Sequence, residues 1–170
     1  MPRYIHTTRA PREIRGFTLV ELMITVLVAA ILLVIAVPSF KGVISRTNLA
    51  SVNDGLISAL RYARTEAVSR GTHVAVSASS GSNGWADGWN VVALAPDPDD
   101  NEMLRQQGAL QSRYKVDATP TKVDFGPQGT ADTDACFTVS DEDAGDESKP
   151  KYLRVMRSGS IHSTDSCTSP

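Results

Sequence analysis

One carboxylate, that of Glu21, lies inside the long apolar stretch near the start of this 170-residue chain. From Leu22 to Val37, only Thr25 is not strictly apolar. An ionisable group costs about 2.5–3.5 kcal/mol at mid-membrane depth, and less near the interface. An ammonium is one of the few groups that compensate a carboxylate in lipid or in a packed core. The sequence therefore predicts a cationic partner for Glu21.

The apolar stretch has the length of a membrane span and follows a basic leader. As a helix, residues 17–37 would cover roughly 30 Å, about one hydrocarbon core. The leader holds four arginines and one acid, Glu13. Positive residues stay cytoplasmic, so we expect the N-terminus inside and the rest of the chain across the membrane. Because residues 35–38 make a poor signal-cleavage site and the helical pattern continues past them, the sequence favours cleavage ahead of the apolar run, after Gly16.

Two cysteines, Cys136 and Cys167, lie in the part of the chain that we place outside the cytoplasm. An even cysteine count in an oxidising compartment predicts one disulfide. Such a bond would stabilise the fold by roughly 3–4 kcal/mol in the chain-entropy model. Neither cysteine has a CxxC partner, so we do not expect zinc.

The other candidate groups do not suggest a catalytic or metal site. The sequence has no Gly-rich phosphate loop, nucleophile elbow or His–carboxylate cluster, so we expect no enzyme, no cofactor and no small-molecule substrate. The acidic loops 97–102 and 141–147 could hold Ca²⁺, but neither fits the EF-hand pattern, and solvated loops are the default. We therefore expect no metal. Trp85 and Trp89 could form a binding surface, although such residues more often fill a core.

The net charge argues against nucleic-acid binding by the whole surface. Removing the leader's four arginines and one acid from 17 basic and 19 acidic residues leaves 13 and 18, a net charge of −5. A local basic patch is still compatible with that balance. One cluster without an intervening acid consists of Lys149, Lys151, Arg154 and Arg157. On an extended strand Lys151 and Arg157 would share one face and Arg154 the other, so the charges do not gather on one face.

The first element that the sequence predicts to position Glu21 and the other candidate residues is one long helix. Past Pro38 the apolar residues recur at spacings of three to five, with polar residues mostly between them. The pattern ends at Arg70–Gly71, a good helix end. We therefore expect a helix over about 17–70, apolar all round in its first half and on one face in its second. Pro38 lacks an N–H and its ring clashes with the preceding turn, so we expect the helix to break there by a bend or a melted stretch.

From residue 72 the helical period gives way to short runs separated by turns. The expected strands are 72–77, 89–94, 114–118, 122–125, 136–139 and 151–156, with a turn at 158–159 leading into 160–162. A long helix followed by many short strands predicts an α+β fold, with the helix packed on a mainly antiparallel sheet. The chain thus divides into a leader (1–16), an apolar helix (17–40), its amphipathic continuation (41–71) and a β-rich head (72–170).

Residues 15–21, Arg-Gly-Phe-Thr-Leu-Val-Glu, resemble the class III prepilin signal of type IV pilins and type II secretion pseudopilins. The resemblance implies that prepilin peptidase cuts between Gly16 and Phe17 and methylates the new N-terminus at Phe17. It also implies that Glu21 meets the N-terminal amine of a neighbouring subunit as a filament assembles. Pro38 matches the proline at which pilin helices bend or melt. The resemblance as a whole implies that the chain has the pilin fold.

The head resembles one branch of that family, the FimT and FimU minor pilins and the H-type pseudopilins. Residues 85–89 are similar to their W-x-x-G-W segment, and residues 125–129 to their F-x-P-x-G turn. Residues 136–139 and 154–160 resemble their terminal strands and Ser-Gly turn. The resemblance implies a low-abundance minor pilin that forms or joins the priming complex at a filament tip.

The resulting hypothesis is a structural subunit of a type IV pilus, with a role in twitching motility and adhesion. We expect it to be held in the bacterial inner membrane by a single span, N-terminus in, and then to enter a filament that spans the periplasm or is extracellular. Its expected partners are prepilin peptidase, other minor and major pilins, and the inner membrane.

Two alternative functions stay open: a pseudopilin H of a type II secretion system, and a DNA-binding minor pilin for natural transformation. Some FimT-like pilins bind DNA through basic residues near the C-terminus that include a G-R-x-R segment. Here residues 158–161 have no Arg after Gly159. Four phosphate contacts from the basic cluster would give only weak, salt-dependent binding.

Overall fold

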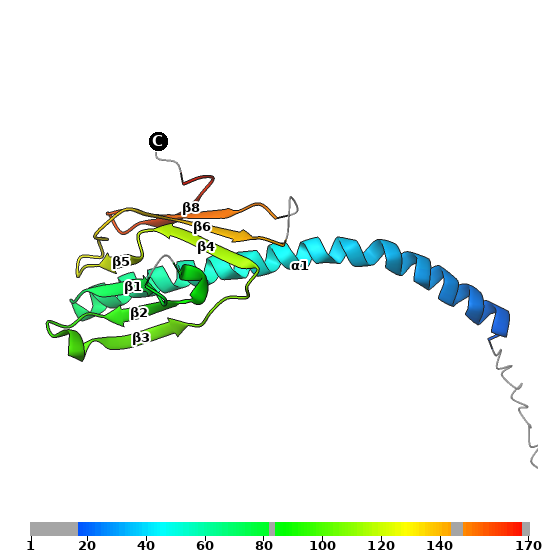
Figure 1. The fold of residues 1–170 in the computed structure, drawn as a ribbon, viewed down its shortest axis with the longest axis horizontal. Helices are drawn as coiled ribbons and strands as arrows, with labels where there is room; N and C mark the ends of the chain where they lie inside the picture. The colour runs from blue at the N-terminus through cyan, green and yellow to red at the C-terminus, as the bar shows by residue number, and fades with distance from the viewer. Residues whose placement is uncertain (1–16, 82–83, 144–147, 168–170) are drawn as a thin grey trace, which may run out of the picture. The chain divides into compact units, whose positions relative to one another are not determined.

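The computed structural model describes residues 17–81, 84–143 and 148–167, and only the backbone of 35–43 (Figure 1). The chain separates into two compact units, residues 1–39 and 40–170. The predicted leader, including Gly16, lies outside the described residues. The first unit contributes the start of a helix, and the second unit contains the rest of that helix and all of the strands.

The helix α1 spans Leu19–Arg70, 52 residues, close to the expected 17–70. Gly71 ends it with φ 67°, and its N–H donates to the carbonyl of Ala67 at 3.0 Å, an end that favours glycine. The backbone stays helical through Pro38, contrary to the melted stretch. The alternative, a bend at Pro38, stays a prediction. Among the residues described, no helix combines the length and apolar character that crossing a membrane requires.

In the part of the chain that the structure describes, eight strands form two antiparallel four-stranded sheets, where the sequence predicted one mainly antiparallel sheet. Sheet A has the order β3-β2-β1-β5, with β3 at Glu102–Gln107, β2 at Trp89–Ala93, β1 at Val74–Ala78 and β5 at Lys122–Phe125. Sheet B has the order β4-β6-β7-β8, with β4 at Tyr114–Thr119, β6 at Ala135–Asp141, β7 at Lys151–Val155 and β8 at Ile161–Thr164. Two short 3-10 turns, η1 at Trp85–Asp87 and η2 at Pro98–Asp100, lie between strands of sheet A. The α+β prediction is confirmed.

One strand, β3, was not predicted. Five of its six side chains are exposed, so the segment shows none of the apolar alternation that identifies a half-buried strand. It forms the outer edge of sheet A, where β2 is its one strand partner within the described ranges. The other strands match the expected runs within one or two residues, and β5 matches at both ends.

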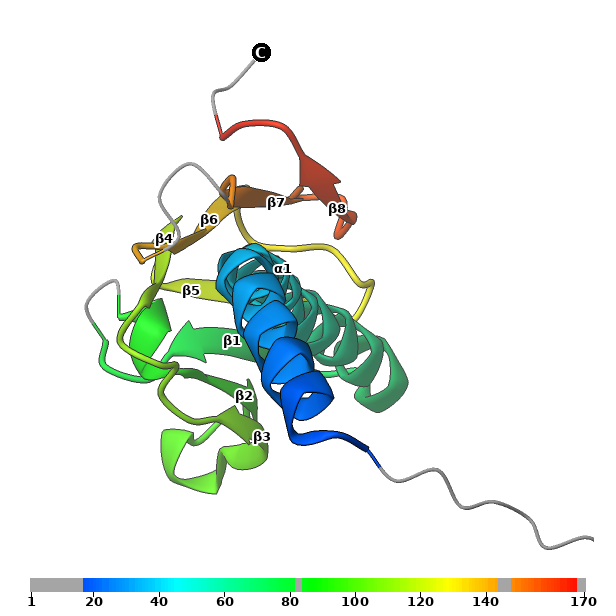
Figure 2. The ribbon, with the colours of Figure 1, turned by 90° about the vertical axis from the view of Figure 1, so that its right-hand side faces the viewer.

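The core of the second unit lies between α1 and the inner faces of both sheets (Figure 2). Spacings of seven, four, three and four residues place one apolar face of α1 against the sheets. Its fully buried members are Leu49, Leu56, Leu60, Ala63 and Ala67, and Ala59 beside Leu60 is fully buried too. From the sheets, Trp85 packs edge-on against Phe137, with ring centroids 4.8 Å apart and planes at 88°. Such an arrangement places the positive edge of one ring on the negative face of the other.

Candidate functional site

Glu21 lies in the first turn of α1, and Thr18 directly precedes this helix. The hydroxyl oxygen of Thr18 accepts a hydrogen bond from the backbone N–H of Glu21 at 3.2 Å, and its carbonyl accepts one from Leu22 at 3.2 Å. These contacts make Thr18 an N-cap. The T-x-x-E spacing is that of a capping box, and it would have revealed this role from the sequence alone. The Glu21 carboxylate also lies at the positive end of the helix dipole.

No cation of the chain pairs with Glu21 in the part that the structure describes. Phe17, the residue predicted to become the N-terminus, is 75% exposed. From Leu19 to Val34 every described side chain of α1 is exposed, and most are large and apolar. This surface is far larger than the apolar patches of ordinary soluble monomers, so it requires lipid or protein to cover it.

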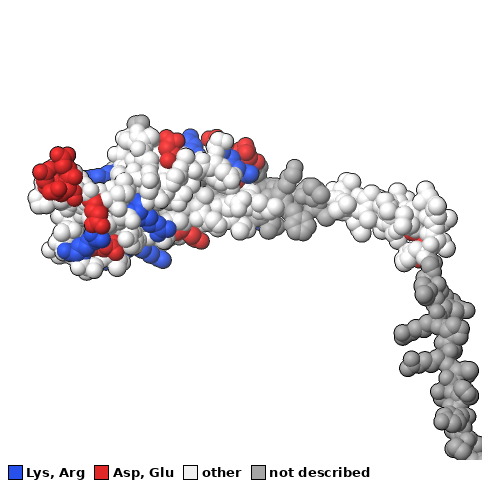
Figure 3. All heavy atoms as spheres, turned by 90° about the horizontal axis from the view of Figure 1, so that it is seen from below, with Lys and Arg blue, Asp and Glu red and all other residues white. Residues whose placement is uncertain are grey.

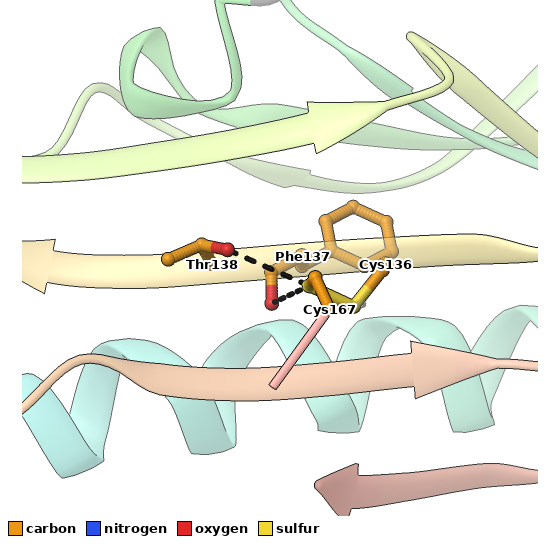
Figure 4. Close-up of a disulfide and its surroundings, with 4 residues drawn as sticks. All are labelled: Cys136, Phe137, Thr138 and Cys167. Atoms are coloured by element: carbon orange, nitrogen blue, oxygen red, sulfur yellow. Dashed lines mark hydrogen bonds between the residues drawn. A yellow bond between two sulfur atoms is a disulfide. The ribbon is translucent and has the colours of Figure 1, made fainter. Parts of the chain in front are cut away.

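Cys136 and Cys167 form the predicted disulfide, which fixes the end of the chain to β6 (Figure 4). Their Cα atoms are 5.7 Å apart. The hydroxyl of Thr138 lies 3.5 Å from the sulfur of Cys167, and the carbonyl oxygen of Phe137 lies 3.8 Å from it. A disulfide sulfur has no hydrogen to donate, so Thr138 is the donor in the first contact and the second is van der Waals packing.

The structure does not gather the basic cluster into one patch. Lys149 and Lys151 line a cavity of about 760 Å³, whereas Arg154 and Arg157 line another of about 540 Å³. Asp134 lines that second cavity too, and its carboxylate accepts a hydrogen bond from the backbone N–H of Arg157 at 2.8 Å. On the face drawn in Figure 3, basic and acidic side chains of the head are interspersed.

A buried ionic network, which the sequence analysis missed, joins α1 to sheet B. The Asp141 side chain is fully buried. The Arg113 guanidinium donates hydrogen bonds to both of its carboxylate oxygens, from Nε to Oδ1 at 3.0 Å and from Nη2 to Oδ2 at 2.6 Å. The hydroxyl of Ser45 donates to the same carboxylate and accepts a bond from Arg113 at 3.2 Å. Ser45 and Asp141 are 96 residues apart, so no local motif signals the contact.

These contacts hold Asp141 in its charged form. Hydrogen bonds from Arg113 lower the pKa of the Asp141 carboxyl below its usual range. Burial opposes that shift, and bonds from Ser45 and from the backbone N–H of Asp143 add to it. A buried carboxylate needs such compensation, because an unpaired one would lose its hydration without replacement.

The two tryptophans are structural. Trp85 is fully buried, and its ring N–H donates to the carbonyl of Pro120 at 3.3 Å, while Trp89 is 3% exposed. Between them Gly88 has φ 103°, and a Cβ there would collide with the carbonyl oxygen of Gln107. The W-x-x-G-W segment therefore anchors one end of sheet A rather than presenting an aromatic surface.

Two glycine turns contact each other and α1. Gly129 and Gly159 both have positive φ, 74° and 78°. A Cβ on Gly159 would collide with the carbonyl oxygen of Gly129, which also accepts a hydrogen bond from Nε of Arg64 at 2.9 Å. The backbone N–H of Ala131 donates to the carbonyl of Arg157 at 3.0 Å. This junction explains why the F-x-P-x-G and Ser-Gly motifs need glycine.

Several described carboxylates of the acidic loops form caps and ion pairs. Asp97 accepts a hydrogen bond from the N–H of Asp99 at 3.1 Å and caps η2. Glu102 pairs with Arg70 at 2.5 Å. In the second loop, residues 144–147 lie outside the described part. Within the described ranges, no three His, Cys, Asp or Glu side chains are placed to hold a metal ion.

Solved structures with a similar arrangement of helix and sheets show which fold the chain has. Two crystal structures of the type IV minor pilin FimU from Pseudomonas aeruginosa PAO1 resemble the chain. One is 21% identical and matches 72% of this chain and 97% of its own, with a TM-score of 0.60. The other is 22% identical and matches 71% and 96%, with a TM-score of 0.57. The fold is therefore the pilin fold.

Two protein-family models match the chain. A model described as type II transport protein GspH matches residues 53–159, more than half of the chain. A second model, the prokaryotic N-terminal methylation motif, matches residues 12–37. The chain belongs to the GspH family and carries the methylation motif, which confirms the resemblance inferred from the sequence. Motif and family imply membrane insertion followed by assembly into a filament.

Proposed function

We propose that this protein is a minor type IV pilin, a structural subunit that helps to start filament assembly at the tip and so supports twitching motility and adhesion. The observation that carries the proposal is an exposed apolar helix start, bearing the methylation motif, joined to a head of the GspH family with the fold of FimU. Members of a structural family need no catalytic centre for this role.

Assembly begins with a cut between Gly16 and Phe17, which removes residues 1–16. The new N-terminal amine is then methylated. In the membrane, the exposed apolar side chains of α1 contact lipid. During assembly they move into the filament core, where other subunits replace the lipid. The Glu21 carboxylate then pairs with the N-terminal ammonium of a neighbouring subunit, because both charges are otherwise costly in an apolar core.

Before assembly the chain lies in the bacterial inner membrane with its N-terminus inside, as the arginines of the leader favour. Its partners there are prepilin peptidase and the other minor and major pilins. The head reaches the periplasm, where oxidising conditions allow the Cys136–Cys167 disulfide to form.

A second candidate function is that of the minor pseudopilin H in a type II secretion system. The observation that favours it is the family itself, whose description is type II transport protein GspH. Natural transformation receives less support, because the candidate cations for DNA line two separate cavities, each with at least one acid beside them.

A clean gene deletion tests the proposal, with surface pili, twitching, protein secretion and DNA uptake scored together. We expect pili and twitching to be lost and complementation to restore them. Loss of secretion with normal pili would replace the proposal by the pseudopilin function. Normal pili with lost DNA uptake would replace it by DNA capture.

A further inference from the structure

The cavity of about 760 Å³ between α1 and strands β7 and β8 is not used by the assembly mechanism above. Its size is that of ordinary ligand pockets, about 300–1,000 Å³. Asn53 of α1 lines it and is only 7% exposed. The Asn53 side-chain oxygen is buried and has no hydrogen-bond partner among the residues described. A buried acceptor left unpaired is unfavourable and rare in native proteins, so a donor from a bound partner would be stabilised at this position.

Four charged side chains of both signs line the same cavity. They are Asp54, Lys149, Lys151 and Asp165. None of the four forms an ion pair within the described ranges. A polyanion such as DNA would be repelled by the two carboxylates, and a polycation by the two ammonium groups. A polypeptide segment that carries both signs matches this lining.

The strand beside the cavity, β8, has an open edge. It is the last strand of sheet B, and among the described residues it pairs only with β7 (Figure 2). The N–H of Met156 donates to the carbonyl of Ser160 at 2.9 Å. Because bonded and non-bonded pairs alternate along an antiparallel ladder, the backbone groups of Ile161 and Ser163 point away from β7. Such an edge accepts a further strand, and Ser163 also lines the cavity.

We propose that the cavity and the open edge of β8 form one docking site for an extended segment of another pilin-like subunit. This inference rests on the proposed function, since it names a contact within the filament or its priming complex. The segment hydrogen-bonds to the backbone of Ile161 and Ser163. One of its side chains, an amide or an ammonium, donates to the oxygen of Asn53. The disulfide at Cys167 holds the chain just after β8 and so keeps Asp165 beside the cavity.

The test places the photo-crosslinker p-benzoyl-L-phenylalanine at Asp165 of the full-length chain in its own host. A matched probe at Met103 lies on the open edge of the other sheet, where the side chain is 53% exposed. In sheared filaments we expect an adduct from position 165 whose peptide maps to another subunit with the methylation motif. The adduct from position 103 is expected to be at least fivefold weaker.

Two variants at Ser163 test the strand pairing. Ser163→Pro removes an N–H that faces the open edge, and proline is tolerated on edge strands. We expect it to reduce the adduct at least fivefold. Ser163→Ala keeps the N–H and should leave the adduct unchanged. Equal loss in both variants would contradict pairing through the backbone.

Asn53→Leu separates binding from stability. Replacing a buried, unpaired acceptor by an apolar side chain of similar size should raise the Tm of the compact unit of residues 40–170 by about 3 °C. The same variant should weaken the adduct at least fivefold, because the donor of the partner loses its acceptor. An adduct that Asn53→Leu does not change would overturn the role of the cavity.

The outcomes also separate this inference from the proposed function. Filaments that contain the chain but show no adduct at 165, an adduct to its own residues 168–170, or a nuclease-sensitive adduct would overturn the docking site alone. Absence of the chain from pili would overturn the proposed function, and absence from both pili and pseudopili would overturn the docking site with it.

Discussion

Asp141 is the charged residue on which the contact between α1 and sheet B depends. Its side chain is fully buried, and both of its oxygens are bonded by Arg113. Its lowered pKa means that the folded protein binds its proton more weakly than the unfolded chain does. The stabilising contribution of Asp141 is therefore complete above the unfolded pKa of about 3.9, and it is lost as the pH falls through the lower folded pKa.

Asp141→Asn removes the charge and keeps the shape. We expect the Tm of the compact unit of residues 40–170 at pH 6 to fall by roughly 5 °C, because Arg113 and Ser45 lose a charged partner. The difference from the unchanged unit should shrink as the pH is lowered from 6 to 3. Asp117→Asn is the control, since Asp117 lies exposed and 3.9 Å from Lys115. A constant difference across this pH range would contradict the assignment.

Glu21 and Thr18 allow the charge at the helix start to be separated from the cap. Glu21→Gln removes the charge, while a glutamine still fits the third position of a capping box. We expect it to reduce incorporation into sheared filaments at least fivefold with normal membrane levels. Thr18→Ala, which removes the cap and keeps the carboxylate, should reduce incorporation by less than twofold. Equal effects of the two changes would indicate a structural role for Glu21.

Among the elements, the turn between β7 and β8 has the strictest requirement for glycine. Gly159→Ala would combine a positive φ with a collision against the backbone of Gly129. We expect its Tm to fall by roughly 10 °C or more, or the head not to accumulate. Gly81→Ala isolates the backbone term, because Gly81 has φ 72° and open space around its Cβ. By thermal unfolding it should lose about half as much, and equal losses would mean that the junction with Gly129 tolerates a methyl group.

Elements with one buried face could be predicted from the sequence, and others could not. The end of α1 at Arg70 and both ends of β5 follow from periodicity and turn residues. β3 gave no signal, since its side chains are mostly exposed on both faces. The division into two sheets depends on which strands pair across long loops, such as β1 with β5, and a single sequence carries no record of that pairing.

The same limit applies to the candidate site. The disulfide followed from cysteine count and compartment, and the tryptophan role from general burial preferences. The network of Ser45, Arg113 and Asp141 did not, because its members are scattered along the chain and each is an ordinary polar residue. The Thr18 cap was readable in the T-x-x-E spacing. The basic cluster looked continuous in the sequence, but the fold divides it between two cavities.

For the molecule as a whole, the proposed function depends on one cut, between Gly16 and Phe17. We expect Gly16→Ala to block processing almost completely, because the peptidase recognises the glycine before the cut. The chain should then migrate as the longer precursor on gels and stay absent from sheared filaments. Arg3→Ala, at a position in the same leader that is far from the cut, should leave processing unchanged. A mature form of normal size from Gly16→Ala would contradict cleavage between Gly16 and Phe17.

The Ser45–Asp141–Arg113 network also has a mechanical consequence. If the proposed function holds, force on the filament pulls the subunit through its helix, while an attachment at the other end holds the head. Tension along α1 then reaches the head first at Ser45, the buried residue nearest the helix start among the side chains that are described. The two hydrogen bonds that join Ser45 to Asp141 and to Arg113 are loaded before the apolar face that begins at Leu49. Acid conditions that protonate Asp141 would therefore lower the force at which the helix begins to peel from the head.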